Sequence, residues 1–268
     1  MICFPNAKIN LGLNIIKKRT DGFHNIETIM FPIPLFDVLE IRESDTFSID
    51  IFGETENIPT EENTIYKTWE KLSANFSIPA FTIKLLKNIP TSAGLGGGSS
   101  NASFFLKEIN TNYHLGLSDE NMKELISEIG SDCPFFIDNK PSLVSSVGEF
   151  LSHLKINLSG RYLSLIKNST RISTKQAYGL SHPKIPETYI KNIILQDISY
   201  WRNTLKNDFE EVIKPLFPEL NKIKNSLYDL GADYVSLSGS GSTIFVLSES
   251  PIDLSTFKNF DFCWQKLI

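Results

Sequence analysis

The chain has 268 residues, of which 41% are hydrophobic and 21% charged, and it carries a formal net charge of -5. This length and composition are ordinary for a folded globular protein with one large domain or two smaller ones. The acidic balance excludes a broad basic surface for nucleic acid or for an anionic membrane, and we expect neither partner. An anionic ligand would therefore need a locally positive site or one built from backbone amides.

The cysteines and the hydropathy pattern indicate a cytoplasmic protein. Cys3, Cys133 and Cys263 are odd in number and widely spaced, which is typical neither of a disulfide framework nor of a zinc site. No apolar run reaches the roughly 18 residues that would indicate a membrane span. The first patterned segment begins at Phe4, so we expect no signal or transit peptide.

The first 55 residues are predicted to form strands. The segment AKINLGLNI alternates apolar and polar residues, and IETIMFPI and DVLEIR are rich in β-branched and aromatic residues. A helix is predicted between Glu61 and Phe76, where apolar residues recur at helical spacing after the polar PTEENT, which offers caps. The next segment, AFTIKLLKNIP, is predicted to form another strand.

The stretch PTSAGLGGGSS that follows is a candidate phosphate-binding loop. Glycines let backbone N–H groups approach a ligand closely, and a helix that starts inside such a loop adds unsatisfied amides and a positive dipole end. The alternative is a flexible turn with a serine N-cap. The Walker pattern requires a lysine after the glycines, and the dinucleotide fingerprint requires a third glycine at position 99, so neither fits. The residues of the loop are Pro90, Thr91, Ser92, Ala93, Gly94, Leu95, Gly96, Gly97, Gly98, Ser99 and Ser100.

Helices are predicted on the far side of this loop. Ala102, Phe105, Leu106 and Ile109 lie on one helical stripe directly after it. The segment LSDENMKELISEIG is predicted to form a further helix that stops at Gly130.

The first strand carries a polar face. Alternation places Lys8, Asn10, Gly12 and Asn14 on one side and the apolar residues on the other. A solvent-facing strand side and a surface that accepts a ligand explain this pattern equally well.

Two further short segments carry candidate site residues. Phe23 and His24 follow the turn signal Asp21-Gly22; they could stack against a planar ring, or they could simply pack in a hairpin. Asp132 lies just before an apolar run, where it is either a general base or metal ligand, or a helix cap. We expect its neighbour Cys133 to be a buried structural residue.

A second group of elements is predicted from about Gly160. It comprises the strand RYLSLIK, helices within 173–230, the strands DYVSL and TIFVLS, and a closing helix and strand. The predicted domains are therefore 1–157 and 158–268. A second glycine turn joins two of these strands: alone it predicts a hairpin, and together with the first loop it could abut nucleotide phosphates. Its candidate residues are Ser238, Gly239, Ser240 and Gly241.

Taken in order, PNAKINLGLNI, DGFHNIETIM, PTSAGLGGGSSNAS, GSDCPFF and SLSGSGST resemble the motif set of the galactokinase, homoserine, mevalonate and phosphomevalonate (GHMP) kinase superfamily. The match spans nearly the whole chain. The AKINLGL start, the DGFH pair and GLGGGSSNA look most like those members that phosphorylate an alcohol linked to cytidine diphosphate in the non-mevalonate isoprenoid pathway. Another small-molecule kinase of the superfamily, for homoserine or mevalonate, is the alternative.

The resemblance implies an α+β fold of two lobes with the active site in the cleft between them. The first lobe would resemble the ribosomal S5 domain 2 fold, and the second would be ferredoxin-like. Pro90 to Ser100 would wrap the triphosphate of ATP, Lys8 and Asp132 would be the catalytic pair, and Asn10, Phe23 and His24 would bind the cytidine-bearing substrate.

The resemblance also leaves open points. Phe23 stands where family members commonly have tyrosine, which keeps a stacking face but removes a hydroxyl. Mg²⁺ is coordinated mainly by phosphate oxygens and water, and Ser99 or Ser100 is a candidate protein ligand for it. The region 170–186 shows no pattern that can be mapped onto the family. The protein is expected to be a monomer or a homodimer.

Overall fold

A computed structural model describes residues 1–53, 58–167, 169–170 and 173–268. These residues form two compact units, and the chain passes between them several times. Residues 54 and 55, which belong to the predicted strand region, lie outside the described residues. The first unit comprises Met1–Lys8, Pro32–Thr91 and Gly96–Lys140, and the second comprises Ile9–Phe31, Ser92–Leu95 and Pro141–Ile268.

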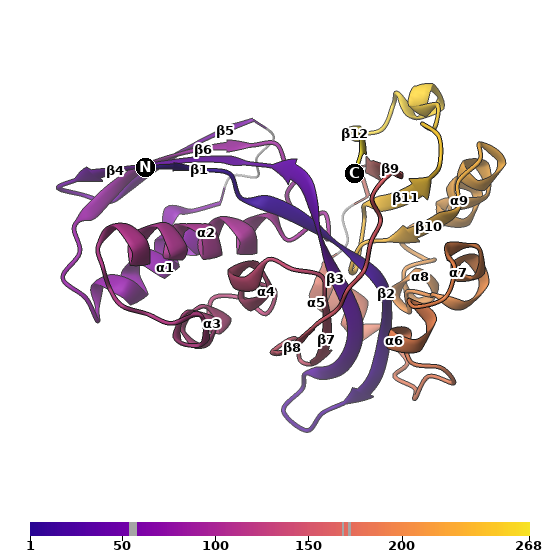
Figure 1. The fold of residues 1–268 in the computed structure, drawn as a ribbon, viewed down its shortest axis with the longest axis horizontal. Coiled ribbons are helices and arrows are strands. Elements are labelled where there is room, and N and C mark those ends of the chain that lie inside the picture. The colour runs from indigo at the N-terminus through magenta and orange to yellow at the C-terminus, as the bar shows by residue number, and fades with distance from the viewer. Residues whose placement is uncertain (54–57, 168, 171–172) are drawn as a thin grey trace. The chain divides into compact units, whose positions relative to one another are not determined.

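The first unit is one sheet with helices on one face, as Figure 1 shows for α1 and α2. The sheet has the strand order β1-β4-β6-β5, with β4 antiparallel and β5 parallel to β6. Its strands are β1 (Ile2–Cys3), β4 (Val38–Ser44), β5 (Ser48–Gly53) and β6 (Ala80–Lys87). Its helices are the short 3-10 helix η1 (Thr60–Glu62), α1 (Thr64–Ser73), α2 (Gly97–Asn112), α3 (Asp119–Ser127) and α4 (Cys133–Asp138).

The core of the first unit confirms the helical stripes predicted from the sequence. Ala102, Phe105, Leu106 and Ile109 of α2 are all fully buried against the sheet. Of the polar residues in PTEENT, it is Asn63 that caps α1: its side chain accepts a hydrogen bond from the Ile65 amide. This helix therefore begins where a polar side chain replaces the missing backbone acceptor.

The second unit contains two sheets. The long strands β2 (Asn6–Lys18) and β3 (His24–Phe36) form the hairpin visible in Figure 1, and both enter the first unit at one end. With β7 (Ser142–Ser146) and β8 (Phe150–His153) they make the order β2-β3-β7-β8. The other sheet has the order β10-β11-β9-β12, with every neighbouring pair antiparallel.

Helices complete the second unit. They surround a core in which Leu13 and Ile15 of β2 pack with residues of the C-terminal sheet. The strands of that sheet are β9 (Tyr162–Lys167), β10 (Tyr234–Leu237), β11 (Ile244–Ser248) and β12 (Phe262–Leu267). The helices are α5 (Thr174–Gly179), α6 (Ile190–Ile193), α7 (Ile198–Thr204), α8 (Phe209–Val212), α9 (Leu220–Asp229) and the 3-10 helix η2 (Leu254–Phe257).

The predicted α+β class and the order of elements are confirmed, with small differences. The helix expected to stop at Gly130 ends at Ser127, and the closing helix is the single 3-10 turn η2. The two compact units do not follow the predicted boundary between residues 157 and 158, because the β2–β3 hairpin packs mainly with the C-terminal residues. The boundary stays a prediction.

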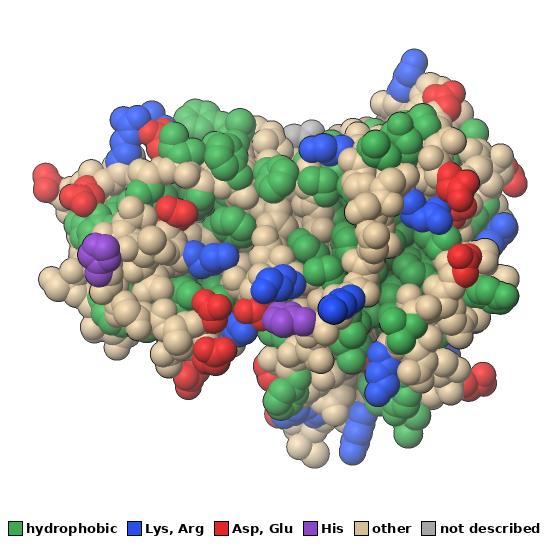
Figure 2. Space-filling view, in the orientation of Figure 1, with side chains coloured by type: hydrophobic (Ala, Val, Ile, Leu, Met, Phe, Trp, Pro, Cys, Tyr) green, Lys and Arg blue, Asp and Glu red, His purple; other side chains and the backbone are tan. Residues whose placement is uncertain are grey.

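Surface charge is mixed. On the face drawn in Figure 2, acidic and basic side chains are interspersed, and the described residues form no continuous basic area there. None of the described helices combines the length and apolar character that crossing a membrane requires.

Candidate active site

Lys8 and Asp132, which are 124 positions apart in sequence, meet in the first unit. The Lys8 Nζ lies 3.3 Å from Asp132 Oδ2. The Lys8 side chain is only 3% exposed, whereas that of Asp132 is 30% exposed, so the carboxylate is the member of the pair that a ligand can reach. The solvent-facing alternative for this face of the first strand is wrong for Lys8 and for Asn10, because both are buried.

Local sequence explains how Asp132 is presented. It precedes α4, whose first turn contains Pro134, a residue that is well suited to a helix start. Asp132 occupies the N-cap position, yet its side chain makes no capping hydrogen bond. The helix-cap alternative is therefore wrong, and the carboxylate is directed to Lys8 instead.

Cys133 is a buried structural residue, as expected. Burial raises the pKa of its thiol to about 12, so the thiol stays protonated at neutral pH. Ser103 Oγ, in α2, donates to the Cys133 carbonyl at 2.8 Å. Cys133 thus joins α4 to the first turns of α2 and is no nucleophile.

The glycine loop enters α2 through a glycine rather than a serine cap. Gly96 is the N-cap residue, with φ of +72°, and no side chain caps the helix. A Cβ at this position would lie 2.9 Å from the Phe136 ring and 3.1 Å from Lys8 Cγ. The serine N-cap alternative is therefore wrong. The first turn of α2 carries no acidic residue, so its amides and its dipole stay available to an anion.

The middle of the same loop, Ser92 to Leu95, belongs to the second unit and packs on the second glycine turn. A Cβ at Gly94 would lie 2.0 Å from the Ser238 carbonyl oxygen, and Ser238 Oγ donates to the Gly94 carbonyl at 2.7 Å. The second turn is thus more than a hairpin, because it supports the first loop. Ser242 Oγ and Thr243 Oγ1 beside it are buried and have no hydrogen-bond partner among the described residues.

The ring-bearing segment has a partner that the sequence did not reveal. His24 stacks on Tyr178, with ring centroids 5.0 Å apart and planes 17° from parallel. Burial, followed by the charge of Lys18, holds the pKa of His24 below its usual value of 6.5, so the ring is neutral at pH 7. Phe23 is 64% exposed and takes no part in this stack. Tyr178 lies in the region 170–186, of which residues 171 and 172 fall outside the described residues.

Asn10 is oriented by a short chain of hydrogen bonds. Its Nδ2 donates to Thr28 Oγ1 at 3.0 Å, and Thr28 Oγ1 donates to the Gly12 carbonyl at 2.6 Å. The Asn10 Oδ1 lies 3.4 Å from the position that a Cβ at Gly239 would take. The polar face of β2 therefore presents this amide toward the second glycine turn.

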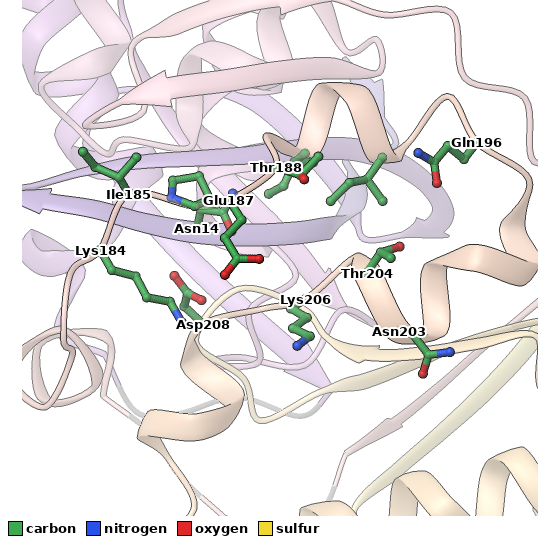
Figure 3. A pocket seen from close by; sticks show the side chains of 13 residues that line it. Asn14, Lys184, Ile185, Glu187, Thr188, Gln196, Asn203, Thr204, Lys206 and Asp208 are labelled. Carbon is green, nitrogen blue, oxygen red and sulfur yellow. The ribbon is translucent and has the colours of Figure 1, made fainter.

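Asn14, at the outer end of that face, lines a separate cavity of about 420 Å³ in the second unit. Figure 3 shows Lys184, Glu187, Lys206 and Asp208 around it, so its rim carries both signs of charge. The Asn14 Nδ2 donates to Glu27 Oε2, which also accepts from the Ile190 amide. This end of the face anchors α6 to the hairpin.

The described residues show no metal site built from side chains alone. The described residues contain no cluster of three or more His, Cys, Asp or Glu side chains that could hold an ion. Ser100, one of the two serines predicted to approach a metal, is fully buried, and its Oγ has no partner among the described residues. Ser99, the other, is partly buried.

Comparison with known proteins defines the class. The family model for the GHMP kinases N terminal domain matches residues 63–140, and that for the GHMP kinases C terminal domain matches residues 189–260. The chain belongs to the GHMP kinase family and is an ATP-dependent small-molecule kinase. The predicted superfamily and the two-lobe GHMP architecture are thereby confirmed.

Similar proteins of known name narrow the class. The chain is 43% identical to a 4-diphosphocytidyl-2-C-methyl-D-erythritol kinase of Parabacteroides distasonis, over 98% of this chain and 97% of that one. It is also 43% identical to the enzyme of that name from Porphyromonas gingivalis, over the full length of both. A crystal structure of a 4-(cytidine 5'-diphospho)-2C-methyl-D-erythritol kinase matches with a TM-score of 0.83 and 28% identity, over 99% of this chain and 98% of that one. A homoserine kinase from Cytophaga hutchinsonii, at 19% identity and a TM-score of 0.71, shares the fold.

Proposed function

We propose that this kinase transfers the γ-phosphate of ATP to the 2-hydroxyl of 4-diphosphocytidyl-2-C-methyl-D-erythritol, a step of the non-mevalonate isoprenoid pathway. The observation that carries the chemistry is the contact of Lys8 Nζ with Asp132 Oδ2 at 3.3 Å. Full-length identity of 43% to kinases of that name supports the choice of acceptor. The homoserine and mevalonate alternative has only fold-level similarity behind it.

Asp132 and Lys8 have complementary roles in this proposal. Phosphoryl transfer needs an acceptor hydroxyl in line with the γ-phosphate and stabilisation of charge on the transferred group. The partly exposed Asp132 carboxylate accepts the proton of the 2-hydroxyl as the oxygen attacks phosphorus and ADP leaves. The buried Lys8 ammonium fixes the carboxylate and offsets negative charge that develops on the attacking oxygen.

The glycine loop would hold the triphosphate through its main chain. The uncapped start of α2, with no acidic residue in its first turn, suits a polyanion. The second glycine turn supports the loop from the Gly94 side and keeps its backbone in position. An acidic protein can therefore bind ATP without a surface that is basic overall.

Mg²⁺ fits the loop at Ser100. Its hydroxyl is an orphaned buried oxygen at the start of α2, which is the kind of atom that an ion or its water would satisfy. The Ser99 hydroxyl is not among the buried oxygens that lack a partner in the described residues, so Ser100 is the better supported of the two predicted ligands. When bound, Mg²⁺ neutralises charge on the phosphate oxygens.

Rings in the second unit would recognise the cytosine. Tyr178 and His24 are already stacked, and a neutral His24 can both donate and accept a hydrogen bond at a base edge. Asn10, whose Nδ2 donates to Thr28 Oγ1, would bind the acceptor substrate from the polar face of β2. The expected cleft between the lobes and the monomeric or dimeric state stay predictions.

One assay tests the proposal. Purified protein is incubated with ATP, Mg²⁺ and, in separate reactions, 4-diphosphocytidyl-2-C-methyl-D-erythritol, mevalonate and homoserine, and ADP release is followed. We expect turnover with the cytidine compound alone, and a new phosphomonoester signal by phosphorus NMR. Asp132→Asn is the matched control, because it keeps the shape of the side chain and removes the base. ADP release with mevalonate or homoserine, and none with the cytidine compound, would contradict the proposal.

A further inference from the structure

A buried polar cluster in the first unit bonds the two segments that flank the glycine loop. Its centre is Asp37, which is fully buried between β3 and β4. The backbone of Asp37 is itself fixed, because its amide donates to the Pro5 carbonyl at 2.9 Å. No motif marks Asp37 in the sequence, because an acidic residue between two strands is common in turns.

The carboxylate of Asp37 binds the chain where it leaves β6 and enters the glycine loop. Its Oδ1 accepts from the Asn88 amide at 2.8 Å and from the Ile89 amide at 2.9 Å. The Asn88 side chain adds a bond to the Phe36 carbonyl at 2.8 Å. Hydrogen bonds from amides to an ionised carboxylate are short and strong compared with neutral ones. The entry to the loop is thereby fixed.

The same carboxylate binds the helix that the loop leads into. Its Oδ2 accepts from Asn101 Nδ2 at 2.9 Å and forms a salt bridge with the ammonium of Lys87. The Lys87 ammonium also donates to Asn101 Oδ1 at 3.2 Å, which closes a ring of three side chains. A single acidic side chain thus joins both ends of the predicted phosphate loop.

The position of Lys87 explains why this cluster concerns the loop. Its Nζ lies 3.0 Å from the place that a Cβ at Gly97 would occupy, so the ammonium sits under the first residue of α2. A buried carboxylate that only pairs with one cation contributes little to the net free energy of folding. Here the four donors to Asp37 among the described residues come from the two ends of one loop.

The bonds of Asp37 also determine which backbone amides near the loop can bind a phosphate. The Asn88 and Ile89 amides already donate to Asp37, and Pro90 has no N–H. The first amide free to serve a phosphate is therefore that of Thr91. Pro90, counted among the predicted ATP-binding residues, would contribute only shape.

We propose that Asp37 is a positioning residue for ATP: its carboxylate joins the entry of the glycine loop to α2 and holds the loop's amides in their binding arrangement before the nucleotide arrives. Preorganisation of this kind improves the affinity for ATP, because the entropy cost of ordering the loop is met during folding and is not subtracted from the free energy of binding. The inference rests on the proposed role of the loop and does not depend on the identity of the acceptor.

Direct titration of ATP without acceptor tests the inference. The dissociation constant for ATP is measured by calorimetry for wild type, Asp37→Asn and Asn101→Leu. We expect Asp37→Asn to raise it about tenfold or more, as the loss of charge-assisted bonds implies, and Asn101→Leu to raise it by a smaller factor. Asn101→Leu breaks only the helix end and leaves the salt bridge of Asp37 with Lys87, so it decides the question if Asp37→Asn does not fold.

Met122→Ala is the control for a purely structural effect. Met122 is buried in α3 and belongs to the hydrophobic core of the first unit, which also contains the buried residues of α2. It is not part of the ring of side chains around Asp37. It should lower Tm and leave the dissociation constant for ATP unchanged. An unchanged constant in Asp37→Asn or, where that variant does not fold, in Asn101→Leu would overturn the inference, as would an equal rise in Met122→Ala.

Turnover separates this inference from the proposed function. With the acceptor supplied, Asp37→Asn should raise the KM for ATP and leave the KM for the acceptor unchanged. If wild type does not turn over the cytidine compound, the proposed function fails, while the ATP titration still decides the role of Asp37.

Discussion

The proposed catalytic pair, Lys8 and Asp132, and the ring-bearing segment, Phe23 and His24, are held in very different ways. Lys8 is 3% exposed in the interior of a strand and is in contact with Asp132. Phe23, in the turn between β2 and β3, is 64% exposed, and only its neighbour His24 has a ring partner. Groups that act on a reacting atom need positions fixed within a fraction of an ångström. Groups that select a substrate by stacking tolerate more freedom.

The largest effect is expected from the catalytic pair. Lys8→Ala and Asp132→Ala should each lower kcat by roughly 10² or more, because the proposed mechanism has both groups act mainly in the transition state. The KM for ATP should change little. Steady-state kinetics of ADP release check this. Lys17→Ala, an exposed lysine of the same strand, is the matched control and should keep full activity. Turnover close to wild type in either variant of the pair would remove the catalytic assignment.

The next largest effect is expected at the start of α2. Gly97→Val should weaken ATP binding more than tenfold, because even a Cβ there would lie 3.0 Å from both Ile89 Cγ2 and Lys87 Nζ. ATP titration together with Tm measures it. At Gly98 the nearest atom to a new Cβ is Thr64 Oγ1, at the ordinary distance of 3.7 Å, so Gly98→Ala should fold normally. Unchanged ATP affinity in Gly97→Val would contradict the role of the loop.

The two regions also differed in how far the sequence predicted them. Lys8 and Asp132 could be singled out because each lies in a distinctive local pattern, but their contact depends on tertiary packing that no local pattern encodes. The structure also decided between the alternatives at Asp132 and in the glycine loop, where a serine cap was possible, because it shows that no side chain caps either helix start among the described residues.

Two residues that no sequence pattern marked as functional, Tyr178 and Asp37, were missed for the same physical reason. Tyr178 lies in α5, a helix of six residues, and an aromatic residue there is typical of core packing as much as of a binding site. Asp37 lies between two strands, and an acidic residue in such a connection is typical of an ordinary turn. Both become visible only through partners distant in sequence, His24 for Tyr178 and Lys87 for Asp37.

The stacked pair allows a prediction of intermediate size. Tyr178→Ala should raise the KM for the acceptor by a factor that corresponds to the loss of about 1 to 3 kcal/mol of base stacking, which is roughly 5- to 150-fold. His24→Ala should act in the same direction. The KM for ATP serves as the internal reference in the same assay and should stay constant. A variant whose two KM values rise together would indicate a general loss of structure instead.

Acidification should reproduce part of that effect. Because burial and Lys18 hold the pKa of His24 below 6.5, the ring is neutral above that pH and gains a proton as the pH falls through its lowered pKa. The stability that the neutral ring contributes is present above pH 6.5 and is lost on the acid side. The KM for the acceptor should rise there by several-fold. His24→Gln, which does not titrate, should show a flat profile over the same pH range; an unchanged transition in that variant would assign it to another group.

Phe23 should have the smallest effect of all. Its backbone is fixed by a hydrogen bond from its amide to Asp21 Oδ1 at 3.1 Å, but its ring is mostly in solvent. Ordering such a ring on a ligand costs about 0.5 to 1.5 kcal/mol of side-chain freedom, which offsets much of what stacking would contribute. Phe23→Ala should therefore raise the KM for the acceptor less than Tyr178→Ala does, and Phe23→Tyr should stay within about twofold of wild type. Measuring the three variants side by side makes the comparison direct, and a Phe23→Ala defect as large as that of Tyr178→Ala would show that the exposed ring, not the prearranged one, selects the substrate.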